Sequence, residues 1–165
     1  MALTAKMILD INIAYTSAKD LATASHQISL PRGLTLTNGT GANKGDVCFD
    51  DSRTLADGAN ETIDLHDGTL TDSLGNAVTF DILRGIYVKN NSSDASLYIG
   101  GAAATQLGLF ADTSDKLKLP PGGEFLFTAP DATGVDVTTN ADLKFEHDGT
   151  GSSTLTYDII VLGED

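Results

Sequence analysis

The fold class is decided by the stretch KLKLPPGGEFLFT, residues 116–128. In two short runs, Leu117 and Leu119 alternate with two lysines, and Phe125 and Phe127 alternate with Glu124, Leu126 and Thr128. Period-two alternation predicts strands that are buried on one face. Between the runs lies Pro120–Gly123, where proline removes a backbone donor and glycine permits positive φ. We therefore expect two core-facing strands joined by a turn or corner.

The same pattern recurs from end to end of the chain. Residues 7–15 alternate so strictly that Met7, Leu9, Ile11, Ile13 and Tyr15 share one strand face. Turn signals follow further on, with Asp67-Gly68 predicting a hairpin and Gly75-Asn76 a second turn. The whole pattern predicts roughly nine to eleven strands.

A few segments depart from this pattern. Residues 19–25 are short and alanine-rich, which suggests a single helical turn. Pro31-Arg32-Gly33 is expected to separate a strand at 27–30 from another at 34–37. The small residues 100–104 are expected to lead into one short helix. None of these segments resembles a long linker, so the chain is expected to be a single domain, residues 1–165, with a short N-terminal arm at residues 1–5.

The fold class expected from these features is all-β. Many short strands separated by turn residues are typical of antiparallel sandwiches, jelly rolls and barrels. We expect an antiparallel β-sandwich of jelly-roll type. A chain of 165 residues is long enough to bury one substantial core.

The composition excludes several classes of partner. The formal net charge is −13, which repels phosphate backbones and anionic lipid surfaces, so we expect no nucleic-acid and no membrane partner. No apolar run approaches the ~18 residues that a transmembrane helix needs, and no signal-peptide pattern is present. Cys48 is the single cysteine, so no intrachain disulfide can form, and a thiol within a short strand is interpreted as a buried apolar group.

Candidate catalytic residues are few. His26, His66 and His147 lack the spacing of a metal-ligand pair, and no nucleophile elbow accompanies them. The loop at residues 39–45 is glycine-rich but lacks the Gly-Lys-Ser/Thr ending of a phosphate loop, so it is interpreted as a flexible surface loop. We expect no catalytic residue, no cofactor and no enzyme activity.

Clusters of aspartate offer the oxygen ligands that calcium prefers. They are Asp50, Asp51, Asp57, Asp112 and Asp115. The carboxylates are scattered and show no EF-hand spacing, so solvation and turn formation are the favoured roles, and no metal site is assigned.

Several blocks, taken in order, resemble a family of small structural proteins of tailed phages and prophages. The blocks are Asp20–Ala24, Gly39–Asp46, Arg53–Ala56, Glu61–Leu65, Leu70–Asn76, Tyr98–Ala103, Pro121–Gly123, Ala129–Gly134 and Thr156–Gly163. The resemblance extends over most of the chain, and it lies in the ordered series because each block alone is ordinary strand-and-turn sequence.

The resemblance implies a virion component, most like the capsid decoration (cement) proteins of bacteriophages. Such proteins are often jelly rolls that bind as homotrimers to the outer surface of the assembled head. It therefore implies that the partner is the major capsid protein, that the chain is made in the host bacterial cytoplasm, and that it resides on the outer capsid surface. The residues that contact the shell are not assigned.

Two other function classes stay open. A phage tail or head-fibre module could bind a host surface glycan, although tryptophan is absent and most Phe and Tyr residues occupy positions that suit a core. A β-sandwich hydrolase or isomerase would need an acid, a base and a nucleophile gathered in one pocket.

Overall fold

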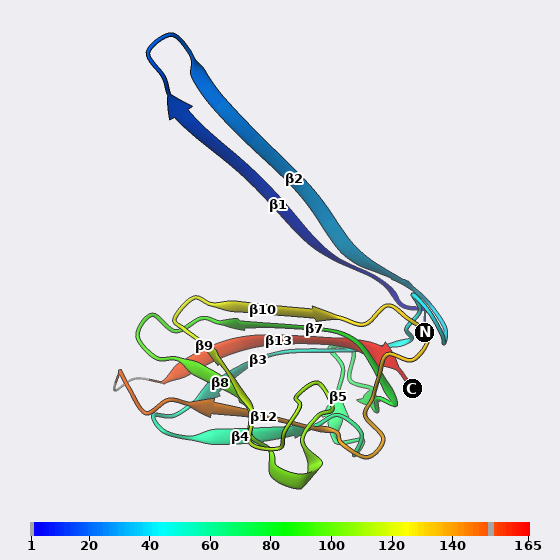
Figure 1. The fold of residues 1–165 in the computed structure, drawn as a ribbon. Coiled ribbons are helices and arrows are strands. Elements are labelled where there is room, and N and C mark those ends of the chain that lie inside the picture. The colour runs from blue at the N-terminus through cyan, green and yellow to red at the C-terminus, as the bar shows by residue number, and fades with distance from the viewer. Residues whose placement is uncertain (1, 152–153) are drawn as a thin grey trace.

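The computed structural model describes residues 2–151 and 154–165. It shows a two-layered β body from which one long β-hairpin projects (Figure 1). The upper layer of the body is a sheet of order β10-β7-β13-β3, and the lower layer is a sheet of order β4-β12-β8-β9. The projecting hairpin is β1 and β2, which form a separate two-stranded sheet.

The strand bounds assign most of the strands to the two sheets of the body. The upper sheet contains β3 (Val47–Leu55), β7 (Ile82–Asn90), β10 (Glu124–Thr128) and β13 (Leu155–Glu164), with β11 (Val135–Asp136) added at one end of β7. The lower sheet contains β4 (Asn60–Asp64), β8 (Leu97–Gly100), β9 (Lys116–Leu119) and β12 (Asp142–His147). Outside them lie β1 (Thr4–Ala18), β2 (Thr23–Thr37), β5 (Leu70–Thr71), β6 (Ala77–Val78) and the 3-10 helix η1 (Ala103–Thr105).

The core fills the space between the two sheets. All pairings within the two sheets are antiparallel, and the side chains of β12 alternate between buried and half-buried positions. Ile159 and Val161 of β13 face Leu143 and Phe145 of β12 within one buried cluster. The Phe145 ring stacks on Tyr157 with 4.5 Å between ring centroids. The expectation of an all-β fold with antiparallel sheets is thus confirmed, and neither sheet closes into a barrel.

The corner in residues 116–128 passes from one sheet to the other. β9 belongs to the lower sheet and β10 to the upper sheet. The Gly123 N–H donates to the Pro120 carbonyl at 2.8 Å, and Gly122 has φ +71°, a conformation that favours glycine. Leu119 is buried, and Leu117, Phe125 and Phe127 pack against the core. The predicted core-facing strands and their corner are confirmed.

Other expectations were only partly correct. The described residues contain thirteen strands, of which β5, β6 and β11 have two residues each, and the expected count of roughly nine to eleven is not confirmed. The Asp67-Gly68 turn is present, but β4 and β5 do not pair, so the hairpin predicted there is wrong. The Gly75-Asn76 turn instead joins β5 to β6, and the short helix predicted after residue 100 is confirmed as η1.

The largest differences lie in residues 19–37. No helical turn forms at 19–25, because Lys19–Ala22 is a turn closed by a 2.8 Å bond from the Lys19 N–H to the Ala22 carbonyl, and β2 begins directly after it. β2 also continues through Pro31, which pairs with Asp10. A strand paired on one side only directs alternate N–H groups outward, so a proline there costs no ladder bond.

No helix among the described residues is long and apolar enough to cross a membrane.

Candidate interaction surface on the projecting hairpin

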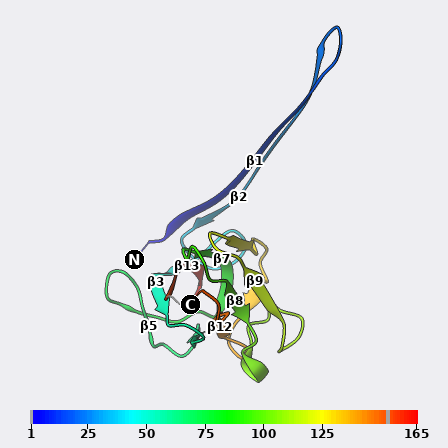
Figure 2. The same ribbon diagram turned by 90° about the vertical axis from the view of Figure 1, so that its left-hand side faces the viewer.

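The projecting hairpin is residues 4–37. Its strands Thr4–Ala18 and Thr23–Thr37 form fifteen residue pairs without a bulge, and residues 19–22 form the turn at its tip. At about 3.3 Å per residue such a ribbon is roughly 50 Å long. It leaves the body at one end of the upper sheet and extends into solvent, which two perpendicular views show (Figures 1 and 2). A two-stranded ribbon without further packing is marginally stable at best.

The two faces of the projecting hairpin differ sharply in polarity. Residues directly opposite one another in an antiparallel pair lie on the same face. One face is mostly apolar and carries the pairs Ala5–Leu36, Met7–Leu34, Leu9–Arg32, Ile11–Leu30, Ile13–Ile28 and Tyr15–His26. The other face is mostly polar and carries Lys6–Thr35, Ile8–Gly33, Asp10–Pro31, Asn12–Ser29, Ala14–Gln27 and Thr16–Ser25.

The body covers the apolar face only at the root of the hairpin. Leu34, Leu36 and Leu162 form a small buried cluster, with Met7 and Cys48 packed against it. Gly85 makes room for this contact, since a Cβ at that position would lie 2.8 Å from the Met7 Sδ. The root is therefore fixed by hydrophobic packing on the outer surface of the upper sheet.

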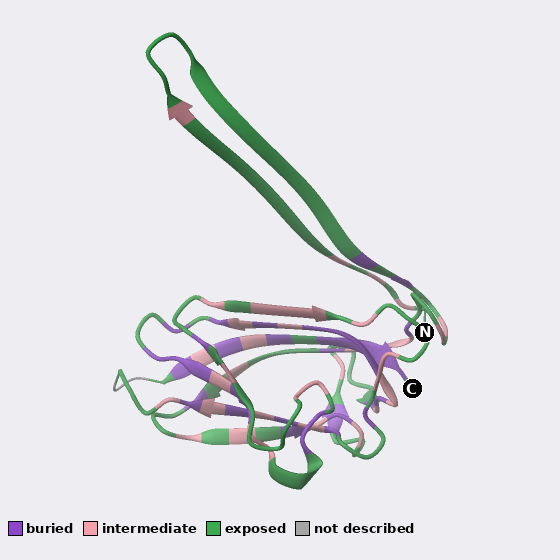
Figure 3. Ribbon diagram, viewed as in Figure 1, coloured by how far each residue is buried: buried purple, intermediate pink, exposed green. Residues whose placement is uncertain are grey.

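Beyond the root, most of the apolar face is exposed to solvent. Six side chains that are 37–71% exposed form what we call the apolar stripe: Leu9, Ile11, Ile13, Tyr15, Ile28 and Leu30. Figure 3 shows nearly the whole distal hairpin in the colour of exposed residues, in contrast to the purple core of the body. At the tip, Leu21 is fully exposed. Contiguous apolar patches of this kind mark interaction sites in soluble proteins.

The loop after β2 fixes the hairpin to the body through hydrogen bonds. The Gly41 N–H donates to Glu164 Oε1 at 2.8 Å, and the Asn43 N–H donates to the Pro130 carbonyl at 2.9 Å. The Leu3 N–H, before β1, donates to Asn38 Oδ1 at 2.8 Å. These donors of the glycine-rich loop are thus used to hold the root in place, and the loop serves as the anchor of the hairpin.

The same contacts bear on the N-terminal arm expected at residues 1–5. Met1 lies outside the described residues, and Thr4 and Ala5 already belong to β1 at the hairpin root. The element that projects from the body is therefore the hairpin itself.

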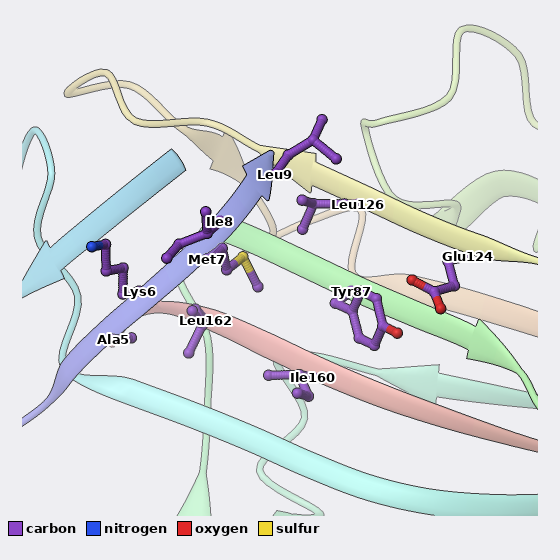
Figure 4. A pocket seen from close by; sticks show the side chains of 10 residues that line it. All are labelled: Ala5, Lys6, Met7, Ile8, Leu9, Tyr87, Glu124, Leu126, Ile160 and Leu162. Carbon is purple, nitrogen blue, oxygen red and sulfur yellow. The ribbon is translucent and has the colours of Figure 1, made fainter. Parts of the chain in front are cut away.

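A groove opens where the hairpin leaves the upper sheet. It has a volume of about 560 Å³, and its walls are residues 5–9 of β1 together with Tyr87, Leu126 and Ile160 of the sheet (Figure 4). Burial, followed by the nearby Glu124 carboxylate, raises the pKa of the Tyr87 hydroxyl. The groove extends the apolar surface of the hairpin onto the body.

The candidate catalytic histidines are not brought together. His26 lies exposed on β2 in the projecting hairpin. His66 follows β4, and its Nδ1 bonds the Phe80 carbonyl at 2.9 Å. His147 ends β12, where it is buried and its Nδ1 accepts the Gly149 N–H at 3.0 Å. Because β4 and β12 run antiparallel, these last two histidines lie at opposite ends of the pair.

The aspartate clusters form turns and ion pairs. Asp112 Oδ1 accepts the backbone N–H and the hydroxyl of Ser114 at 2.9 and 2.8 Å, and Asp51 pairs with Arg53 at 2.9 Å. Among residues 2–151 and 154–165, no group of three or more His, Cys, Asp or Glu side chains is arranged to hold a metal ion. Cys48 is half-buried, and burial, then Asp50 and Asp72, raise the pKa of its thiol above the usual range.

Comparisons of the chain with protein-family models, with curated proteins and with solved structures found no match. The candidate site therefore depends on the geometry of the molecule alone. Its central feature was missed by sequence reasoning, which found the alternation of residues 7–15 but not that their apolar face lies outside the core. The one available signal was the equal length of two alternating segments on either side of a short turn.

Proposed function

We propose that this chain is a non-enzymatic capsid decoration (cement) protein that binds the outer surface of an assembled bacteriophage head. The observation that carries the proposal is the projecting hairpin, a long ribbon that extends from a body with a complete core and presents a fully exposed leucine, Leu21, at its tip. Such a ribbon gains stability only by packing against another surface. The proposal also uses the ordered sequence blocks that resemble phage structural proteins.

We also propose that the body is a jelly roll. Without the two-residue strands, the body has eight strands from β3 to β13. When these eight are numbered 1 to 8 in chain order, the upper sheet has the order 1-8-3-6 and the lower sheet the order 2-7-4-5. This order is that of a double Greek key, and jelly rolls of this kind are frequent in viral shells and lectins. The fold supports the function only by analogy.

The distribution of charge is consistent with this location. The projecting hairpin carries three basic side chains (Lys6, Lys19, Arg32) and two acidic ones (Asp10, Asp20), so its formal charge is +1. Since the whole chain carries −13, the remaining residues carry −14. A strongly acidic body suits the outside of a head better than its DNA-filled interior, because phosphate repels it.

The mechanism follows from the shape of the molecule. A ribbon roughly 50 Å long can reach a capsid subunit that the body does not touch, so one copy can bridge two subunits. Each additional contact then forms at a high effective concentration. Because the protein binds the assembled shell and not free subunits, it stabilises the shell by mass action.

The tip of the projecting hairpin is the proposed point of contact with the shell. Leu21 is fully exposed there and lies at the greatest distance from the root along the ribbon. An apolar side chain at the end of a ribbon can insert into a pocket on a neighbouring subunit and act as an anchor.

The test is to add the purified protein to heads that lack it and to measure co-sedimentation and heat resistance. The wild-type chain is expected to co-sediment and to raise the temperature at which heads rupture. L21D is expected to bind at least tenfold more weakly. L74D is the matched control, since Leu74 is 70% exposed on the β5–β6 turn of the body. Absence of co-sedimentation, together with binding to a glycan array, would overturn the proposal in favour of the host-glycan module.

A further inference from the structure

We propose that the apolar stripe is covered by the projecting hairpin of a second copy of this chain. Two hairpins then pack face to face through Leu9, Ile11, Ile13, Tyr15, Ile28 and Leu30 of each copy. The inference concerns how copies hold one another and does not depend on binding to a phage head.

The first argument is that the stripe is self-complementary in chemistry. Its centre consists of the directly opposed pairs Ile11–Leu30 and Ile13–Ile28, which present four aliphatic side chains and no charge. Two such faces stack as the inner faces of a β-sandwich do, with side chains interdigitating between two ribbons. The charged or titratable members of the face, Arg32 and His26, lie beside the stripe's two ends, where solvent can still reach them.

The second argument is the area of the contact. If each of the six side chains offers on the order of 200 Å² when fully exposed, their exposed fractions of 37–71% correspond to roughly 500 Å² of surface per hairpin. Two hairpins packed face to face would bury roughly 1,000 Å², which is the lower limit for a specific protein–protein interface. The stripe is therefore large enough for one partner of its own kind.

The third argument is electrostatic. The bodies carry −14 each and repel one another, whereas the hairpins carry only +1. The projecting hairpin is thus the part of the chain on which two copies can approach with the least charge repulsion. The stripe begins at Leu9, in the groove beside the body, and ends at Tyr15, roughly 20 Å further along β1. Its outer part is therefore separated from the acidic body by more than the ~8 Å over which charges interact at physiological salt.

The main experiment measures the solution mass of the full chain, 17.2 kDa per copy, by light scattering after gel filtration. Wild type is expected to have the mass of two copies at about 10 μM, because a dimer with a Kd of about 1 μM is mostly assembled at that concentration. I13K/I28K places two charges on the stripe and is expected to run as a monomer. A14K/Q27K places the same charges on the adjacent pair of the opposite face and is expected to remain oligomeric.

A second measurement tests which faces meet. In a C48S background, the single cysteine of I13C is expected to form a disulfide between copies under mild oxidation. The cysteine of A14C, one residue away on the opposite face, is expected to stay reduced. Apart from C48S, which changes a half-buried residue of β3 at the hairpin root, the variants change exposed hairpin positions. Thermal melts of the body check that the fold is retained.

The inference is overturned if wild type is monomeric at that concentration, or if both lysine pairs have the same effect, or if A14C cross-links as readily as I13C. Its failure is distinguishable from failure of the proposed function. I13K/I28K reports on self-association in the absence of any head, whereas L21D reports on head binding with self-association unchanged.

Discussion

The guanidinium of Arg84 and the carboxylate of Glu164 form an ion pair inside the body, with Nη2 and Oε1 2.6 Å apart. Arg84 is fully buried, and its guanidinium also donates to the carbonyls of Asp131 and Ala132. Glu164 Oε1 accepts the Gly41 N–H from the loop that fixes the projecting hairpin. One carboxylate therefore joins the last strand, the centre of the upper sheet and the root of the hairpin.

E164Q is expected to destabilise the protein by about 3–5 kcal/mol, because it leaves the Arg84 charge buried without its counter-ion. Chemical denaturation monitored by circular dichroism measures the change. The control is E124Q, which alters a pair with Lys89 at 3.6 Å on the surface and is expected to cost less than about 1 kcal/mol. Equal effects of the two substitutions would show that the buried pair has no special weight.

G163A is expected to destabilise the body by about 1–3 kcal/mol, the usual cost of forcing extra atoms into a packed site. A Cβ at this position would lie 2.3 Å from the Ile82 carbonyl oxygen and 2.7 Å from the Phe80 ring. Because the nearest of these atoms belongs to the backbone of β7, that strand would have to move. The pairing of β13 with β7 shifts register at this point, Leu162/Gly163. A thermal melt checks this, and an unchanged midpoint would contradict the close approach of the two strands.

F127D is expected to unfold the domain, because an ionised carboxylate would replace a ring that packs against the core. T128D, at the adjacent exposed position of β10, serves as the control and is expected to fold. Soluble expression and circular dichroism distinguish the two outcomes. A folded F127D variant would mean that this strand contributes little to the core.

Acid is expected to destabilise the wild type partly through Asp148. Burial alone would raise the pKa of this carboxyl, but hydrogen bonds from Thr150 and Ser96 outweigh it and lower the pKa to about 2. Because the folded pKa lies below the unfolded value of about 3.9, the contribution is fully present above about pH 4 and is lost as pH falls towards 2. D148N is expected to remove this part of the pH dependence, which denaturation series between pH 2 and 6 would detect; parallel curves would refute the assignment.

Local sequence signals predicted the body well where one face of each strand meets the core. The corner at Pro120–Gly123 needed only proline, glycine and flanking alternation, all of which act within a few residues. Which strands pair is a different matter. The Asp67-Gly68 turn was correctly located, yet β4 pairs with β12 and not with β5, since pairing between distant strands is determined by the global packing of the two sheets.

The projecting hairpin could not be predicted as an exposed element for a related reason. Alternation in residues 7–15 shows that one face is apolar, but it does not say whether the molecule's own body or another molecule covers that face.

For the two histidines that precede Asp-Gly turns, local spacing and the structure can be compared directly. The spacing of His66 and His147 gave no indication of a joint site, and the structure places them at opposite ends of β4 and β12.

Pro31 has a consequence for the fate of the protein at high concentration. An exposed ribbon with two open edges invites uncontrolled addition of further strands and growth into fibrils. Pro31 lies in β2, where it interrupts the row of backbone donors that an incoming strand would need along that edge. Strand addition is thereby hindered along the β2 edge, while the apolar face of the ribbon stays available for packing face to face.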